Sequence, residues 1–244
     1  MKLFITVLDP PTFNRTINIT KNSATLVWEL RKNTNNCTVD KVICFCKAIK
    51  TEGSGYDIQS NNMTFNVSKD DQSNLENFTV VMENLSAYTH YECSAKTIGE
   101  GGESKWSNNT TFLTAEDRPS CPVNFRYSGS IENDRRVFKW ELPHYIPGKL
   151  LSYNLQFTWE PLYKVPSYCF NDNRNCFKDI DPAINDFIYT SEETYAEYKV
   201  QISAKTNAGL GDISVVSFTS KSIGSKNKKL ITVFLTQKKT ENAK

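Results

Sequence analysis

The chain has 244 residues, with 29 basic and 27 acidic side chains, and its formal net charge of +2 excludes a strongly basic nucleic-acid binder as the first interpretation. Hydrophobic residues make up 39% of the chain and aromatic residues 12%, which is enough for folded cores and too much for a disordered chain. No apolar run approaches the roughly 18 residues that a membrane span needs, and seven cysteines are many for a cytosolic protein.

The chain begins with a short apolar segment, residues 1–8, which is followed at once by Asp9-Pro10-Pro11. A secretory signal needs an apolar stretch of about 7–15 residues and a small-residue cleavage site. We therefore interpret residues 1–8 as an ordinary first strand, and the chain as a fragment of a longer protein or the product of a truncated gene model. A signal sequence is the alternative.

Two short motifs occur twice, at a spacing of about 110 residues. Val27-Trp28-Glu29-Leu30 returns as Lys139-Trp140-Glu141-Leu142, and Ser94-Ala95-Lys96-Thr97 returns as Ser203-Ala204-Lys205-Thr206. A repeat of this length indicates two copies of one domain rather than a solenoid of short repeats. The polar segment 114–119, which ends in a proline, is the expected boundary.

Within each copy the local pattern is that of β-strands. The runs 25–30 and 136–142 are short and bounded by turn-forming residues. Apolar and polar side chains alternate along 153–159 and again along 198–204, which is typical of half-buried strands. No segment shows a sustained helical period, so the sequence predicts an all-β protein.

Two antiparallel, seven-stranded β-sandwiches in tandem fit this pattern. We expect the first domain at residues 7–117 and the second at residues 118–222. Residues 223–244 form a basic tail that we expect to be disordered, because they hold six basic groups and one acidic group.

The landmarks of the two copies resemble the fibronectin type III domain. In that family an early strand carries a buried tryptophan, which Trp28 and Trp140 match. The run Leu85-Ser86-Ala87-Tyr88-Thr89-His90-Tyr91 matches the tyrosine corner of the family. The resemblance implies that Tyr91 bonds its hydroxyl to nearby backbone while its ring fills the core. Tyr198 takes this place in the second copy, where the flanking residues depart from the pattern.

The first copy looks most like the ectodomains of receptor-type tyrosine phosphatases, including the leukocyte common antigen type. The similar features are Trp28, then Cys37, then Cys46, then Tyr91-Glu92-Cys93. A true immunoglobulin domain is disfavoured, because no cysteine precedes Trp28 and Val200 stands where the second copy would need one.

The cysteines of the first copy lie on strands that are neighbours in the fibronectin type III fold. Cys93 follows Tyr91 by two residues and so shares its core face, while Cys44 and Cys46 share one face of the long strand before it. Cys93 can therefore reach Cys46 or Cys44. We favour Cys46–Cys93, with Cys37–Cys44 as a further candidate pair.

The remaining cysteines belong to the second copy. Cys169 and Cys176 enclose a polar loop that a local disulfide would close, which leaves Cys121 unpaired. The rival interpretation of Cys44 and Cys46 as half of a zinc site needs further ligands nearby. The two histidines, His90 and His144, fall in different copies, so we expect no metal and no cofactor.

Nine asparagines begin an Asn-x-Ser/Thr acceptor for N-glycosylation, and all nine lie before residue 118. They are Asn14, Asn18, Asn36, Asn62, Asn66, Asn77, Asn84, Asn108 and Asn109. Residues 119–244 contain 10 asparagines and no acceptor. This contrast predicts an extracellular, glycosylated first domain beside a bare second domain, which we expect to hold the contact surface.

No catalytic motif is present: the chain has no Gly-rich phosphate loop, Gly-x-Ser-x-Gly, His-Glu-x-x-His or phosphatase Cys–Arg signature. We therefore expect a non-enzymatic binding and adhesion module of a cell-surface receptor, extracellular in location. Its partner would be a protein ligand or a neighbouring receptor domain, not nucleic acid, and it would contact a membrane only through a segment outside this chain.

Three alternatives stay open. One is a secreted, soluble decoy protein, and another is an enzyme acting through an unrecognised site. The third is a ligand-binding module like those of cytokine receptors, because Ser104-Lys105-Trp106-Ser107 resembles half of their Trp-Ser-x-Trp-Ser box. We expect Trp106 instead to pack near the last strand of the first copy.

Overall fold

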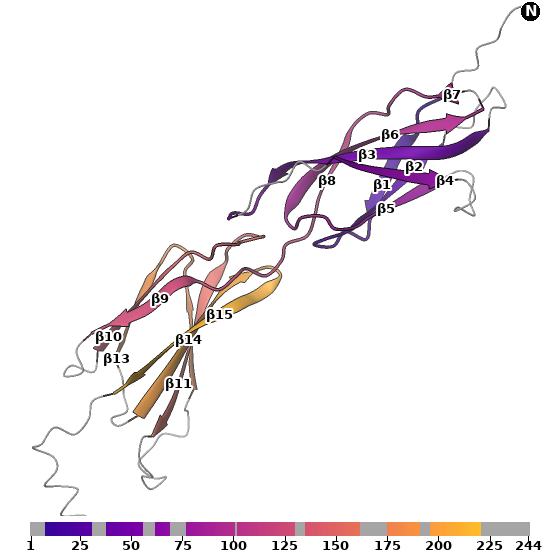
Figure 1. The fold of residues 1–244 in the computed structure, drawn as a ribbon. Coiled ribbons are helices and arrows are strands. Elements are labelled where there is room, and N and C mark those ends of the chain that lie inside the picture. The colour runs from indigo at the N-terminus through magenta and orange to yellow at the C-terminus, as the bar shows by residue number, and fades with distance from the viewer. Residues whose placement is uncertain are drawn as a thin grey trace, which may run out of the picture. The chain divides into compact units, whose positions relative to one another are not determined.

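The structure is a computed structural model that describes residues 8–30, 38–55, 62–68, 77–100, 102–129, 135–161, 175–190 and 196–220 (Figure 1). These residues form strands and connecting loops, with no helix among them. The chain divides into two compact units. The first consists of Met1–Pro119 with the short segments His144–Leu150 and Thr206–Gly209, and the second of Ser120–Pro143, Leu151–Lys205 and Leu210–Lys244.

The described part of the first unit contains two antiparallel sheets. The first sheet has the order β1-β2-β5, with bounds β1 (Thr12–Ile17), β2 (Ala24–Glu29) and β5 (Asn77–Met82). The second sheet has the order β4-β3-β6, and the short strands β7 and β8 both pair with β6. Its bounds are β3 (Val39–Thr51), β4 (Met63–Ser68), β6 (Thr89–Gly99), β7 (Gly102–Glu103) and β8 (Thr110–Leu113).

The position of β4 distinguishes the sandwich of the first unit from an immunoglobulin domain of the constant type. In an immunoglobulin domain of the constant type, the fourth strand belongs to the first sheet. Here β4 pairs with β3 in the second sheet, from Lys41–Ser68 to Cys46–Met63. The strand order of the first unit therefore differs from that of the constant-type immunoglobulin domain.

The core of the first unit lies between its two sheets. Strand β3 places every second side chain in it, because successive side chains of a strand point to opposite faces. The buried core residues are Ala24, Leu26, Trp28, Val42, Cys44, Cys46, Ala48, Phe78, Val80, Met82, Leu85, Tyr91, Cys93, Ala95 and Phe112. Trp28 contacts Phe13 of β1 edge to face, with ring centroids 5.4 Å apart.

The first unit has eight described strands where the sequence analysis predicted seven. The difference arises at the last strand, which is split into β7 and β8 by residues 104–109. These residues stay beside β6 but use serine side chains as well as backbone groups to bond to it. The first predicted strand, residues 1–8, falls almost entirely outside the described residues, and the first strand that is described begins at Thr12.

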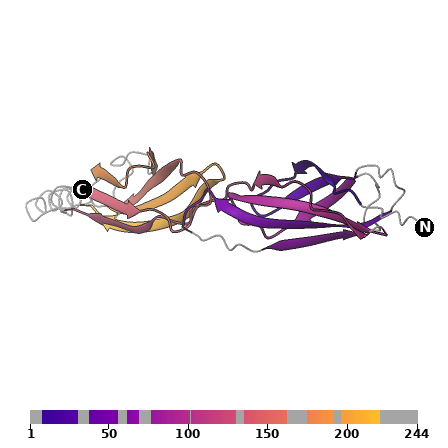
Figure 2. The ribbon, with the colours of Figure 1, turned by 90° about the horizontal axis from the view of Figure 1, so that it is seen from above.

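The described part of the second unit has seven strands in two antiparallel sheets, whose layers can be followed in Figures 1 and 2. One sheet has the order β13-β10-β9 and the other the order β12-β11-β14-β15. The bounds are β9 (Val123–Ser128), β10 (Arg135–Glu141), β11 (Ser152–Pro161), β12 (Asn175–Ile180), β13 (Asp186–Thr190), β14 (Ala196–Thr206) and β15 (Gly209–Thr219). The predicted run 136–142 thus ends one residue early, and Leu142 lies exposed beyond β10.

The core of the second unit is rich in aromatic side chains. Tyr198 stacks on Phe218 with a centroid distance of 4.9 Å, and Trp140 meets Tyr153 edge to face at 5.4 Å. Arg136 is only 2% exposed, and its guanidinium lies 5.1 Å from the centre of the Phe218 ring. The alternation predicted along 153–159 and 198–204 is present in β11 and β14, whose buried apolar residues are Tyr153, Leu155, Phe157, Tyr198, Val200, Ile202 and Ala204. The tail from residue 221 onward lies outside the described residues.

Candidate functional site

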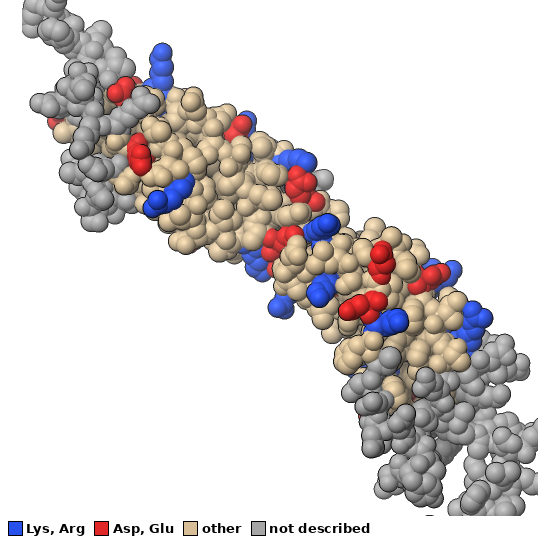
Figure 3. Space-filling model, turned by 180° about the vertical axis from the view of Figure 1, so that it is seen from behind, with Lys and Arg blue, Asp and Glu red and all other residues tan. Residues whose placement is uncertain are grey.

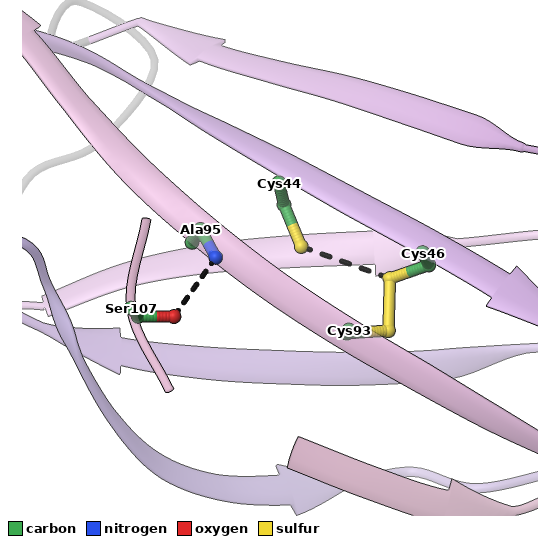
Figure 4. Close-up of a disulfide and its surroundings, with 5 residues drawn as sticks. All are labelled: Cys44, Cys46, Cys93, Ala95 and Ser107. Carbon is green, nitrogen blue, oxygen red and sulfur yellow. Dashed lines mark hydrogen bonds between the residues drawn. A yellow bond between two sulfur atoms is a disulfide. The ribbon is translucent and has the colours of Figure 1, made fainter. Parts of the chain in front are cut away.

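The first unit contains a disulfide between Cys46 and Cys93 within its second sheet (Figure 4). The two residues are directly opposite each other in the β3–β6 ladder, with their Cα atoms 4.2 Å apart. Both are buried, because the alternation of each strand directs them into the core. This is the pair that the sequence favoured. The bridge joins neighbouring strands of one sheet, unlike the disulfide between the two sheets of antibody domains.

Cys44 is a free, buried thiol, so neither the alternative Cys44–Cys93 pair nor the further candidate pair Cys37–Cys44 is formed. Its Sγ lies 3.8 Å from the Sγ of Cys46 (Figure 4). Burial raises the pKa of the Cys44 thiol from 9.0 to about 12, although the Trp28 side chain acts in the opposite direction. The thiol is therefore neutral at physiological pH.

The structure describes only some of the other cysteines for which the sequence predicted a pair. Cys37 and Cys169 lie outside the described residues, and Cys176 is described only through its backbone in β12. Cys121 is a free thiol and is partly exposed.

Tyr91 occupies the corner that the family resemblance implied. Its hydroxyl accepts a hydrogen bond from the backbone N–H of Ser86, at 2.8 Å. Its ring is buried and stacks on Phe112, with centroids 5.5 Å apart. The other landmarks, Trp28, Trp140 and Tyr198, are buried as well.

The segment Ser104–Ser107 is attached to β6 through serine hydroxyls. The Ser104 Oγ accepts the N–H of Thr97 and the Ser107 Oγ accepts the N–H of Ala95, both at 3.0 Å (Figure 4 shows the second bond). In return, the N–H groups of Ser104 and Ser107 donate to the carbonyls of Thr97 and Ala95, at 2.9 and 2.8 Å. The two serines thus supply hydrogen-bond partners for the N–H and C=O groups of Thr97 and Ala95 in β6. A regular neighbouring strand would supply them with backbone groups alone.

Trp106, between these serines, lies on the outer face of the second sheet and is 46% exposed. It contacts Phe45 of β3 edge to face at 6.3 Å, and the Lys96 Nζ lies 5.2 Å from its ring centre. Lys96 also forms an ion pair with Glu103. The Trp106 ring thus packs on side chains of β3 and β6, on the side of the sheet away from the core, and no contact among the described residues joins it to the last strand. We call Ile43, Phe45, Lys96 and Trp106 the outer-face cluster; the sequence analysis did not anticipate it.

Eight of the nine N-glycosylation acceptors lie within the described residues, and Asn36 does not. Seven are exposed, and Asn77 is half-buried. Asn14, Asn66 and Asn77 lie on β1, β4 and β5, the outer strands of their sheets. The other acceptors lie in adjoining loops: Asn18, Asn62, Asn84, Asn108 and Asn109. The acceptors therefore border the edges of both sheets.

His90 and Glu52 form a surface contact. The Nε2 of His90 lies 3.2 Å from Glu52, and the hydrogen bond from Lys50 lowers the pKa of the Glu52 carboxyl. Among the described residues, no group of three or more His, Cys, Asp or Glu side chains is placed to hold a metal ion. On the face drawn in Figure 3, charged side chains of both signs are interspersed over the described surface.

The described residues include no helix long and apolar enough to cross a membrane. No family model matches the chain. One relative is the neural cell adhesion molecule L1 of Takifugu rubripes, which is 29% identical over 129 residues. The match covers 52% of this chain and only 9% of the L1 molecule. The chain is thus an all-β protein with antiparallel sandwiches in tandem, and half of it is similar to a small part of a cell adhesion molecule.

Proposed function

We propose that the chain is an extracellular binding and adhesion module of a cell-surface protein and carries no catalytic site of its own. The observation that carries this proposal is the similarity of 129 residues to a neural cell adhesion molecule, on a fold of antiparallel sandwiches. Recognition by such domains uses loops and strand edges held by a rigid scaffold.

Two features of the first unit support an extracellular location. A buried disulfide persists in oxidising compartments and is rare in the cytosol. The acceptor asparagines are mostly exposed and lie at sheet edges, where a glycan can be attached without disturbing the core. Both features fit a protein that passes through the secretory pathway.

The proposal is tested by secretion and by binding. The chain is fused to a signal sequence and a tetramerising tag, secreted from cultured animal cells, and applied to a panel of cell lines followed by flow cytometry. We expect saturable binding that protease treatment of the target cells removes. A tetramer of an unrelated β-sandwich domain is the control. Retention of the chain inside the producing cells, or binding equal to the control on every line, would contradict the proposal.

Within this function, the second unit is the proposed contact surface. Residues 119–244 lack any acceptor, so glycans would not obstruct a partner there. The outermost strand β15 exposes Ile213 (54%) and Val215 (47%), which a protein partner would bury favourably. In the binding assay above, we expect Ile213→Glu and Val215→Glu to abolish binding and Val81→Glu, at an exposed position of the first unit, to preserve it. The reverse pattern would place the contact on the first unit.

The parent protein is a separate and finer proposal. The resemblance to receptor-type tyrosine phosphatase ectodomains rests on Trp28, Cys37, Cys46 and Tyr91-Glu92-Cys93. Trp28, Cys46, Tyr91 and Cys93 belong to one core, and Cys37 lies outside the described residues. We propose a phosphatase of this type as the parent. The full-length transcript decides: an open reading frame that continues into a hydrophobic span and a phosphatase domain supports it, and any other downstream domain refutes it.

A further inference from the structure

We propose that an N-linked glycan on Asn66 packs across the outer face of the second sheet in the first unit and covers Ile43, Phe45 and Trp106. This inference rests on the proposed extracellular function, because N-glycans are added only in the secretory pathway. It assigns the outer-face cluster an occupant that is attached to the chain itself.

The strand register brings Asn66 to the edge of the cluster. Asn66 is directly opposite Ile43 in the β3–β4 ladder, and Ile43 is directly opposite Lys96 in the β3–β6 ladder. The next residues along these strands, Cys44 and Ala95, point into the core, so this row points outward. Adjacent strands lie about 4.8 Å apart, so the row from Asn66 to Lys96 spans roughly 10 Å. The first sugars of a glycan attached to Asn66 can extend across this distance.

Beside this row lies an apolar surface, formed by Phe45 and Trp106, that the sandwich leaves partly in water. Phe45 lies two residues along β3 from Ile43 and contacts Trp106, which is 46% exposed. Lys96 holds one side of the Trp106 ring with its ammonium group, 5.2 Å from the ring centre. Exposed aromatic area beside an aliphatic side chain favours a partner that removes it from water.

An N-acetylglucosamine ring has the chemistry to cover this surface. One face of the sugar presents C–H bonds, whose partial positive charge is attracted to the negative face of an aromatic ring. Its acetyl methyl group can pack on Ile43, while the hydroxyls at the rim of the sugar stay in water. The sugar thus shields the apolar side chains without burying an unsatisfied polar group.

The other acceptors on this side of the sheet have charged surroundings. Asn62 precedes β4 at the end of the ladder where the outer face carries the Lys47–Glu92 ion pair, at 2.8 Å. The side chain of Asn109 bonds to the same Glu92 carboxylate, and this contact contributes to the lowered pKa of Glu92. Asn66 is therefore the acceptor whose directly opposite residue, Ile43, is apolar, and Asn62, on the same edge, is a matched control.

The experiment measures the protection of Trp106 at residue level. The chain is secreted from animal cells, the occupancy of every acceptor is determined by glycopeptide mass spectrometry, and Trp106 is probed by hydroxyl-radical footprinting. We expect Asn66 to be occupied and the labelling rate of Trp106 to rise several-fold in Asn66→Gln. Ser68→Ala, which removes the same acceptor but keeps Asn66, should give the same rise, and Asn62→Gln should leave the rate unchanged.

The outcomes separate this inference from the function on which it rests. An empty Asn66 beside other occupied acceptors, or a Trp106 rate that is equal in all variants, overturns the inference and leaves the extracellular function standing. A rise confined to Asn62→Gln also overturns it. If a secreted chain carries no glycan at any acceptor, the glycosylated character proposed for the first unit fails together with the inference.

Discussion

Cys44 lies 3.8 Å from a disulfide sulfur and yet remains a thiol. Thiol–disulfide exchange needs a thiolate as the attacking species. Burial in the core raises the pKa of Cys44 to about 12, so the attacking form is scarce at neutral pH. The core thus protects the Cys46–Cys93 bridge from the cysteine beside it.

The raised pKa of Cys44 predicts a specific dependence of stability on pH. The folded-state pKa of about 12 is above the ordinary value of 9.0, so the unfolded chain releases this proton first as the pH rises. Cys44 therefore contributes stability that is complete below pH 9 and is lost toward pH 12, by up to about 1.4 kcal/mol per pH unit.

Urea unfolding of the first unit on both sides of pH 9 measures this dependence. We expect Cys44→Ala to flatten the decline of the unfolding free energy at alkaline pH. Cys121→Ala, which removes a partly exposed thiol, should decline like the wild type. An equal slope in Cys44→Ala and wild type would show that another group is responsible.

Tyr91 combines a buried ring with one hydrogen bond to the backbone. Tyr91→Phe keeps the ring but leaves the N–H of Ser86 without this acceptor, which costs about 1–2 kcal/mol of stability. Chemical denaturation of the first unit measures the loss. Tyr127→Phe, at a partly exposed tyrosine of the second unit, is the control and should leave both units unchanged. A Tyr91→Phe variant as stable as wild type would mean that the corner bond contributes nothing.

At the scale of the element, the last strand of the first unit depends on two serines. Ser104→Ala removes the acceptor of the buried N–H of Thr97, and an unsatisfied donor of this kind costs about 1–3 kcal/mol. We expect amide hydrogen exchange at Thr97 to accelerate in this variant. Lys105→Ala, at the exposed residue next in the chain, should leave that exchange rate as it is. Unchanged protection of Thr97 in Ser104→Ala would refute the role of the hydroxyl.

The long strand β3 shows what could be predicted from the sequence and what could not. The alternation from Val42 to Ala48 was sufficient to predict its core face. Once β3 and β6 were taken as neighbours, Cys46 and Cys44 were both candidate partners of Cys93, and only the structure shows that the partner is Cys46. The same alternation directs Phe45 away from the core, but the outer-face cluster could not be predicted, because nothing in the sequence places Trp106 against that face. Their contact depends on the path of the chain between β7 and β8.

The split of the last strand into β7 and β8 could not be predicted from the sequence either. Ser104 and Ser107 read as ordinary polar loop residues, and nothing local indicates that their hydroxyls replace carbonyls as acceptors for β6. The placement of the acceptors at sheet edges also needed the structure. The motifs identify which asparagines qualify, but only the strand order shows that β1, β4 and β5 are outermost.

At the scale of the whole molecule, the two units differ in what stabilises them. In its described part, the first has a disulfide in its core that joins residues 47 positions apart in sequence. In the second, stacked aromatic side chains such as Tyr198 and Phe218 fill the core. The double variant Cys46→Ala/Cys93→Ala should therefore destabilise the first unit by about 2–5 kcal/mol.

Hydrogen exchange followed peptide by peptide distinguishes the two units in this experiment. We expect faster exchange throughout β2, β3 and β6 of the double variant, and wild-type rates in β11 and β14. Cys121→Ser, which removes a free thiol from the second unit, is the control for loss of a cysteine as such. Equal acceleration in both units would show that the bridge stabilises more than its own sandwich.

The placement of three cysteines on one core face has a consequence for how the sheet is assembled. Cys46 is opposite Cys93, and Cys44 is opposite Ala95. A slip of β3 by two residues would keep every side chain on its own face but would bring Cys44 opposite Cys93. A Cys46–Cys93 bridge and a Cys44–Cys93 bridge therefore correspond to two different alignments of β3 and β6. The pair of cysteines that is bridged shows which alignment of the strands was present when the disulfide formed, and peptide mapping of the secreted protein identifies this pair.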